Sequence, residues 1–338
     1  MKAIVYYRYG SPDVLRCEEI EKPTAGDNEV LIKVRAASVN PYDWHFMRGT
    51  PYLLRMMAGL RKPKTTRLGA DVAGQVEAVG RNVTQFKPGD AVFGMCKGAF
   101  AEYACASESA LVTKRDNLTF EQAAAVPIAA FTALQGLRNK GHIQPGQKVL
   151  INGAAGGVGT FAVQIAKSFG ADVTGVCSAR NVDMVRSIGA DRIIDYTQED
   201  FTKSGQHYDL IFDCVGNHSL LAFRRVLNPK GIYIAVGGPS GRWMIGPLAQ
   251  AITAPVLSWF VSQQLIAFFV AKPSKEDLNT VCELMRAGTV TPVIDRRYGL
   301  SEVAEAIRYL EEGHARGKVV ITLEPKQPLP AIAQGTCR

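Results

Sequence analysis

A glycine-rich turn between an apolar strand and a helix is the feature that most constrains the fold of this chain. Residues 148–180 read KVLINGAAGGVGTFAVQIAKSFGADVTGVCSAR. The pattern predicts a strand over 149–151, a turn of the A-x-G-x-x-G type over 153–159, a helix that stops at Gly170, and a second strand over 173–177. Glycines in such a turn let backbone N–H groups approach a pyrophosphate at a helix N-terminus. We therefore expect Gly156, Gly157 and Val158 to contact the pyrophosphate of a dinucleotide.

The end of the second strand bears on which dinucleotide binds. NAD sites usually carry an Asp or Glu about 20 residues after the glycines, which holds the ribose 2′-hydroxyl. Residues 177–180 are Cys-Ser-Ala-Arg and contain no acid. The Ser178 hydroxyl and the Arg180 guanidinium suit a 2′-phosphate, because they form charge-assisted hydrogen bonds with it. The sequence thus predicts NADPH over NADH, and the alternative is that Ser178 caps the next helix while Arg180 is a surface charge.

Composition excludes several classes of protein. The 338 residues suffice for about two domains, and the net charge of +8 is dispersed apart from a small group at 61–67. Nucleic-acid binding would require a basic stripe with aromatic or helix-motif context, which we do not find, so the charge is interpreted as a field that favours anionic cofactors. The 7 cysteines are single, without a C-x-x-C pair, which favours a reducing cytoplasm and argues against a zinc ribbon.

The pattern of elements predicts two kinds of architecture. Short β-rich runs occupy 2–7, 29–37, 74–79 and 90–94. Residues 126–240 alternate strand and helix, with further strands at 192–195, 210–215 and 232–236, each after a helical pattern, which indicates a parallel sheet covered on both faces. A last helical stretch and a strand at 318–323 precede a proline-containing tail, 324–338, which we expect to be a loose extension.

One long segment, 243–271, contains no charged residue. Its length and hydrophobicity permit a transmembrane interpretation, but its prolines and glutamines argue against a span. We expect it to form core, pocket wall or a subunit interface, and a peripheral membrane contact is the alternative.

Several further motifs accompany the glycine turn in a fixed order: VNPYD at 39–43, GADVAG at 69–74, FKPGDAV at 86–92, EQAAAVP at 121–127, DCVG at 213–216 and GKVV at 317–320. With them the chain resembles the medium-chain dehydrogenase/reductase superfamily over residues 1–323, in its zinc-independent, quinone oxidoreductase-like and enoyl-reductase-like branch. The resemblance implies a two-domain α/β enzyme and a homodimer. A GroES-like catalytic domain with a partly open β-barrel would comprise 1–125 and 272–323, and a Rossmann domain with a doubly wound parallel sheet would comprise 126–271.

The resemblance also allows the metal to be judged. Zinc-dependent members use a Cys followed by a His-Glu pair, where this chain has Asn40 and then Ala70-Asp71. Catalytic zinc needs about three N, S or O ligands, so we expect no metal. Without a Lewis acid, the expected substrates are quinones and α,β-unsaturated carbonyls, because conjugation already makes a carbon electrophilic towards hydride.

The family pattern assigns roles on the cofactor side. Ser178, Arg180 and Tyr196 match positions that hold the 2′-phosphate or the adenosine, and Tyr196 could instead be a packed aromatic at a strand end. Thr132 resembles a threonine beside the nicotinamide, or it bonds a carbonyl inside its helix. Val215 and Gly237 resemble backbone that meets the nicotinamide.

On the substrate side, the Asn40 amide could donate to a carbonyl oxygen or hold a turn before Pro41. Asp43 would orient that loop. His45 could donate a proton, and otherwise it is a structural histidine and solvent supplies the proton. The apolar residues of the insertion 49–67 could contact a bulky substrate or pack on the barrel.

The leading hypothesis is a cytoplasmic NADPH-dependent reductase of quinones or enones that acts without zinc. A dehydrogenase or reductase of simple alcohols and carbonyls is the alternative within enzymes. A non-catalytic NADPH-binding regulatory protein is the alternative outside them, motivated by the uncharged segment.

Overall fold

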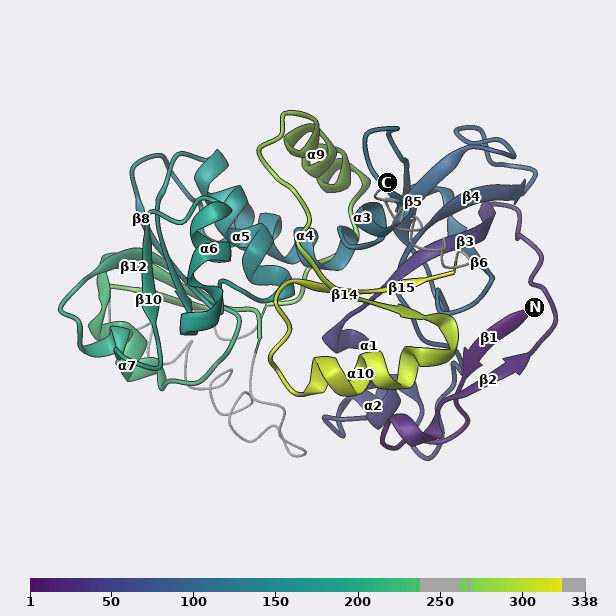
Figure 1. The fold of residues 1–338 in the computed structure, drawn as a ribbon, viewed down its shortest axis with the longest axis horizontal. Coiled ribbons are helices and arrows are strands. Elements are labelled where there is room, and N and C mark those ends of the chain that lie inside the picture. Colours follow the sequence, from purple (N-terminus) through teal and green to yellow (C-terminus); the bar gives the residue numbers. More distant parts are fainter. Residues whose placement is uncertain (238–261, 267–268, 324–338) are drawn as a thin grey trace, which may run out of the picture.

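The structure is a computed structural model that describes residues 1–237, 262–266 and 269–323 (Figure 1). Two large sheets lie side by side, each with its own helices. Most of the uncharged segment 243–271, and the whole tail 324–338, lie outside the described residues. Within the described ranges, no helix has the length and apolar character needed to cross a membrane.

The first sheet is parallel throughout and has the order β10-β9-β8-β11-β12-β13. Its strands are β8 (Lys148–Asn152), β9 (Asp172–Cys177), β10 (Arg192–Asp195), β11 (Tyr208–Asp213), β12 (Leu227–Ala235) and β13 (Gln264–Ile266). Its helices are α4 (Pro127–Leu134), α5 (Gly157–Ser168), α6 (Val182–Ser187) and α7 (Leu220–Arg225). The strand order reverses between β8 and β11, and ligands of such sheets bind at this point, outside the carboxyl ends of the strands.

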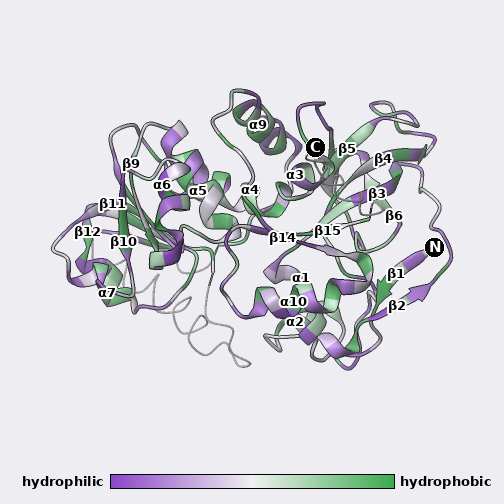
Figure 2. Ribbon diagram, in the orientation of Figure 1, coloured by the Kyte–Doolittle hydropathy of each residue, from purple (hydrophilic) through white to green (hydrophobic). Residues whose placement is uncertain are grey.

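Apolar side chains bury this sheet on both faces, since Leu150, Ile151, Ile211 and Phe212 have no exposed surface. Figure 2 shows the corresponding hydrophobic colour along the strands. The expected strand at 192–195 matches β10. The strand expected at 210–215 instead ends at Asp213. The chain turns there because the Asp213 carboxylate accepts hydrogen bonds from the N–H groups of Val215 and Gly216. The helix expected before β11 is also wrong, since only a 3₁₀ turn, Phe201–Lys203, precedes it.

The second sheet takes its strands from both ends of the chain and has the order β14-β15-β3-β4-β5-β7, with β6 paired to β3. These are β3 (Glu29–Val39), β4 (Asp71–Val79), β5 (Ala91–Met95), β6 (Tyr103–Ser107), β7 (Leu111–Thr113), β14 (Ile294–Gly299) and β15 (Lys318–Thr322), and a separate ladder joins β1 (Lys2–Val5) to β2 (Arg16–Glu19). The helices are α1 (Pro41–Arg48), α2 (Leu54–Ala58), α3 (Phe120–Ala124), α9 (Lys275–Arg286) and α10 (Val303–Glu311). The pairing of β15 with β3 brings the last strand beside the residues that lead into α1.

Candidate active site

The glycine turn lies where β8 passes into α5. Gly153 has a φ of +83°, in the left-handed region that glycine adopts without strain. A Cβ on Gly159 would lie 2.1 Å from the carbonyl oxygen of Gly153, so only glycine permits this close approach of helix and turn. Gly156 caps α5, and Gly157 and Val158 form its first turn, whose N–H groups have no acceptor within the helix. The backbone therefore has the shape and polarity that a pyrophosphate requires.

Three of the expected cofactor residues gather beside this turn, at the carboxyl ends of β9 and β10. The N–H of Tyr196 donates to the carbonyl of Cys177 (3.1 Å), which places Tyr196 next to Ser178. The Tyr196 side chain is 54% exposed, so it is not packed in the core. The guanidinium of Arg180 donates to the carbonyl of His314 (3.3 Å) at the surface. A hydroxyl, a cation and an aromatic ring thus form one exposed rim.

Asn181 lies beside this rim but is buried, and sequence reasoning missed it. Its amide donates to the Ser178 hydroxyl (3.1 Å), and its Oδ1 is buried without a hydrogen-bond partner among the described residues. A polar residue three positions after Ser178 was the available signal, because such spacing is typical of local side-chain bonding in turns.

The ends of β11 and β12 bring Val215 and Gly237 to the same edge of the sheet. The buried Asp213 carboxylate fixes the first of them, since it accepts from Val215 N (3.0 Å), from Asn152 Nδ2 (2.8 Å) and from the hydroxyl of Tyr233 (2.8 Å). A Cβ on Gly237 would lie 2.1 Å from the Cys214 carbonyl oxygen, so glycine is required there.

Thr132 lies in α4, and its hydroxyl donates to the carbonyl of Ile128 (2.8 Å). This contact is the helix-interior bond that the sequence left as the alternative to a nicotinamide contact. The hydroxyl oxygen keeps lone pairs that can still accept a hydrogen bond.

On the other side of the glycine turn, Asn40 is 2% exposed, and both hydrogens of its side-chain amide are donated in hydrogen bonds. Nδ2 donates to the carbonyl of Ser38 (3.2 Å) and to Oδ2 of Asp71 (2.9 Å). Its backbone N–H donates to the carboxylate of Asp43 (2.8 Å), which also accepts from Gly69 N (2.9 Å). Asp43 therefore orients the Asn40 loop, as expected. Burial raises the pKa of Asp43 to about 7, against the opposing effects of these N–H donors and of Lys318.

Lys318, which sequence reasoning did not single out as a site residue, completes this polar cluster. Its ammonium lies 2.5 Å from Oδ1 of Asn40 and 3.6 Å from Oδ2 of Asp71, and the residue is 3% exposed. Burial lowers the pKa of Lys318, while Asp71 and Asp43 oppose that shift. The only signal was the GKVV motif itself, since a strand that begins with Lys ordinarily exposes it.

The strand that carries Lys318 also touches the glycine turn. Gly317 forms a parallel β-bridge with Gly156, and a Cβ on Gly157 would lie 3.1 Å from Cδ of Lys318. The polar cluster around Asn40 and the candidate pyrophosphate cradle are therefore neighbours. They form one site to which both chain ends and both sheets contribute.

His45 lies one turn further along α1. Its Nδ1 is 2.7 Å from the carbonyl oxygen of Thr50, and its ring stacks on Trp44 at a centroid distance of 3.7 Å. Since a carbonyl only accepts, the neutral ring carries its proton on Nδ1 and leaves Nε2 without one. Burial lowers the pKa of His45, although the bond to Thr50 opposes this, so the neutral form is favoured.

Asp71 lies where the family pattern has a zinc ligand. Its carboxylate accepts from Ser38 Oγ (2.7 Å) and from Ile128 N (3.1 Å), as well as from Asn40. In the part of the chain that the structure describes, no three His, Cys, Asp or Glu side chains are grouped as a metal site would need.

Comparison with known proteins agrees with this architecture. Residues 26–116 match the alcohol dehydrogenase GroES-like domain family, and residues 188–321 match the zinc-binding dehydrogenase family. The chloroplast envelope quinone oxidoreductase homolog of Arabidopsis thaliana is 34% identical, over 95% of this chain and 98% of its own. The chain belongs to the quinone oxidoreductase branch of the medium-chain dehydrogenase/reductase superfamily. The expected family and fold class are thereby confirmed.

Solved structures extend the likeness. The quinone oxidoreductase of Coxiella burnetii superimposes with a TM-score of 0.84 at 31% identity, covering 96% of this chain and 99% of its own. A mycobacterial protein solved with NADPH gives a TM-score of 0.80 at 26% identity, covering 96% and 100%. Like other members of the quinone oxidoreductase branch, the protein is an oxidoreductase that uses a nicotinamide cofactor.

Proposed function

We propose that the enzyme transfers hydride from NADPH to a quinone or an α,β-unsaturated carbonyl without zinc. The observation that carries this proposal is the ammonium of Lys318, 3.6 Å from the carboxylate of Asp71. A buried carboxylate needs a compensating charge, and here a side chain supplies the cation that a metal would otherwise bring. Asn40 and Ala70 also replace the ligands that zinc prefers.

The rim formed by Ser178, Arg180 and Tyr196 supports NADPH as the form of the cofactor. A hydroxyl and a guanidinium can bind a 2′-phosphate, whereas the ribose hydroxyls of NADH would offer the guanidinium no anionic partner. The likeness to the mycobacterial protein solved with NADPH points the same way. Bound NADPH would supply the hydride from its nicotinamide ring.

The substrate oxygen gains negative charge as hydride arrives, and Asn40 is our candidate to stabilise it. The 3.2 Å bond from Nδ2 to Ser38 is the longer of its two donated bonds, so this is the one that a substrate oxygen would replace. The Lys318 ammonium on Oδ1 polarises the amide and strengthens that donor. The contact between His45 and Thr50 supports a structural role for His45 and solvent as the proton source.

Steady-state assays with a quinone, an enal and a simple ketone, each with NADPH and with NADH, test the proposal. We expect turnover of the quinone or the enal with NADPH, and equal activity before and after dialysis against a chelator. Turnover of the ketone or of an alcohol alone would instead support the alcohol dehydrogenase alternative. Tight NADPH binding without turnover of any substrate would support the regulatory alternative.

A homodimer and a cytoplasmic location are further proposals. The first rests on the likeness to the superfamily, and sedimentation velocity tests it. The second rests on the cysteines of the described residues, all of which are free, while the Arabidopsis relative has a chloroplast envelope name. Cell fractionation tests the location.

A further inference from the structure

Four large apolar side chains project into solvent from α2 and its flanks. Leu53, Met56, Met57 and Leu60 are 66%, 67%, 78% and 71% exposed. Met56 and Met57 lie on α2, and Leu53 and Leu60 flank it, one on each side. We call these four exposed side chains the apolar face of α2. Such a face normally packs against the core. Of the two uses that the sequence left open for insertion 49–67, packing on the barrel therefore does not apply to these four residues.

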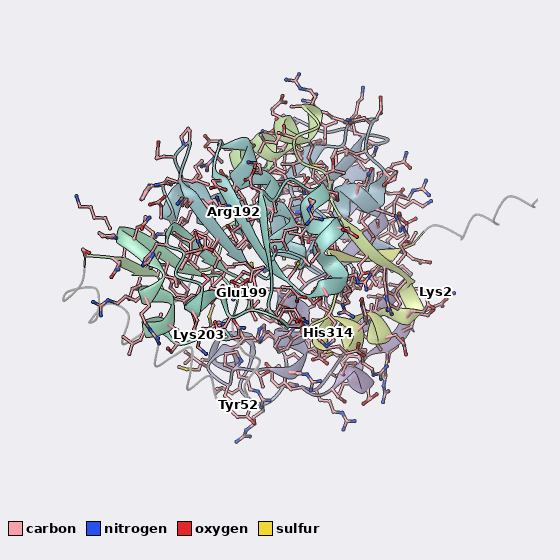
Figure 3. The ribbon with its side chains drawn as sticks, turned by 60° about the vertical axis from the view of Figure 1, so that its left-hand side comes forward. Lys2, Tyr52, Arg192, Glu199, Lys203 and His314 are labelled. Atoms are coloured by element: carbon pink, nitrogen blue, oxygen red, sulfur yellow. The ribbon has the colours of Figure 1, made fainter. Side chains whose placement is uncertain are left out.

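The opposite side of α2 is anchored, and this fixes the outward direction of the apolar face. The guanidinium of Arg55 lies over the rings of Tyr9 (4.4 Å) and Tyr52 (4.8 Å) and donates from Nε to the carbonyl of Gly49 (2.9 Å). The hydroxyl of Tyr9 donates to the carbonyl of Gly59 (2.6 Å). The charged residue of the helix is thus turned inward. In Figure 1, α2 lies at the lower edge of the molecule, and Figure 3 shows Tyr52 at the same edge.

Cations border the apolar face. Arg61, Lys62 and Lys64 follow α2 and are exposed, and Lys64 N donates to the carbonyl of Ala58 (2.7 Å), which holds this basic turn against the helix. The sequence has no Asp or Glu between Asp43 and Asp71, and both of those carboxylates are buried. The apolar face therefore adjoins a basic surface that its own segment does not neutralise.

We propose that the apolar face of α2, with Arg61, Lys62 and Lys64, docks on an anionic membrane surface. The apolar side chains would enter the boundary between headgroups and acyl chains while the cations meet lipid phosphates. Protein interfaces rely on Trp, Tyr and Arg anchors seated in pockets, whereas Met and Leu on one projecting turn suit a fluid apolar layer. This proposal goes beyond the reductase activity and uses none of the residues assigned to the active site.

Co-sedimentation of the full chain with phosphatidylcholine vesicles, with and without phosphatidylglycerol, tests the proposal. We expect binding only with the anionic lipid. The double variant Met56→Gln/Met57→Gln should bind at least about tenfold more weakly, because each buried methylene contributes to partitioning. Lys62→Gln and Lys64→Gln should each weaken binding about fivefold at low salt.

Matched controls separate the patch from general effects. Leu221→Gln changes an apolar residue of α7 that is 56% exposed, and Lys230→Gln changes an exposed lysine, so both should bind as the parent does. All variants should keep the parent's melting temperature and its turnover of a water-soluble quinone.

Three results would overturn the proposal. One is the absence of binding to anionic vesicles. Another is undiminished vesicle binding by the Met56→Gln/Met57→Gln variant. That result would show that the contact with the vesicle is purely electrostatic, as a contact with an acidic protein would also be. The third is a self-association seen by sedimentation velocity that this variant abolishes, which would make a second copy of the chain the occupant.

Discussion

The ammonium of Lys318 lies 2.5 Å from the side-chain oxygen of Asn40, although 278 residues separate them in the chain. The preceding residue, Gly317, bridges to Gly156 in the cofactor turn. Residues 317 and 318, at the start of the last described strand, therefore contact both the candidate substrate-side amide and the candidate pyrophosphate cradle. We infer that Lys318 sets the position of Asn40 relative to the cofactor, rather than contacting substrate itself.

Replacing Lys318 should cost much more stability than replacing a surface lysine. Lys318→Met leaves the carboxylate of Asp71 buried without its cation, so we expect the free energy of unfolding to fall by about 3–5 kcal/mol. Lys203→Met removes the exposed partner of Asp200 and should cost no more than about 1 kcal/mol. Urea denaturation of both variants measures the difference. Equal losses would show that the Lys318 cation does not compensate the buried carboxylate.

Arg180 should decide between the two forms of the cofactor. Arg180→Ala removes a charge-assisted bond to the 2′-phosphate, so we expect NADPH affinity to fall about 10- to 100-fold and NADH affinity to stay the same. Arg186→Ala is the matched control, because Arg186 is an exposed arginine of α6 that pairs with Asp183. Fluorescence titration gives the dissociation constants. An unchanged NADPH affinity would leave Arg180 as a surface charge.

The buried Asp43 should make stability fall as pH rises. Its pKa is raised from 3.8 to about 7 by burial, so between these values the folded chain holds a proton that the unfolded chain has released. Because the native state binds more protons than the unfolded state in this range, the free energy of unfolding decreases as pH rises. The contribution is complete below pH 3.8 and is lost as pH rises through about 7, in total on the order of 4 kcal/mol.

Urea unfolding over that pH range measures this slope. Asp43→Asn loses one acceptor for the N–H groups of Asn40 and Gly69 and should be less stable, but its slope should be flatter than the parent's. Asp209→Asn changes a carboxylate nearer the surface and should keep the parental slope. A parental slope in Asp43→Asn would mean that Asp43 does not titrate in this range.

The fold around the candidate cofactor half of the site could be predicted from the sequence because its signals are local. The strand, the glycine turn and the helix follow one another within 33 residues, 148–180, and each has a characteristic composition. Ser178 and Tyr196 come together because parallel strands end at the same edge. Backbone geometry and short-range order thus suffice for this part.

The substrate half could not be predicted to the same depth, because its contacts are distant in sequence. Nothing near Lys318 indicates that its ammonium is buried against Asn40 and Asp71. The spacing of Leu53, Met56 and Leu60 also misleads, since a period of this kind ordinarily marks a core-facing helix. Here the stacking of Arg55 on Tyr9 and Tyr52 determines which side of α2 faces inward, and that is a tertiary interaction.

His45 should be dispensable for the rate. Its proton lies on Nδ1, bonded to the carbonyl of Thr50, so the neutral ring has none to donate from Nε2. His45→Gln keeps an amide N–H for that carbonyl, and we expect kcat and its pH profile with a quinone and NADPH to match those of the parent. His207→Gln, at an exposed histidine whose Nδ1 is 3.1 Å from the carbonyl oxygen of Gly205, controls for the substitution itself. Loss of a general acid typically costs about 100-fold or more in rate. A fall of that size in His45→Gln alone, with an unchanged melting temperature, would make His45 the proton donor and remove solvent from that role.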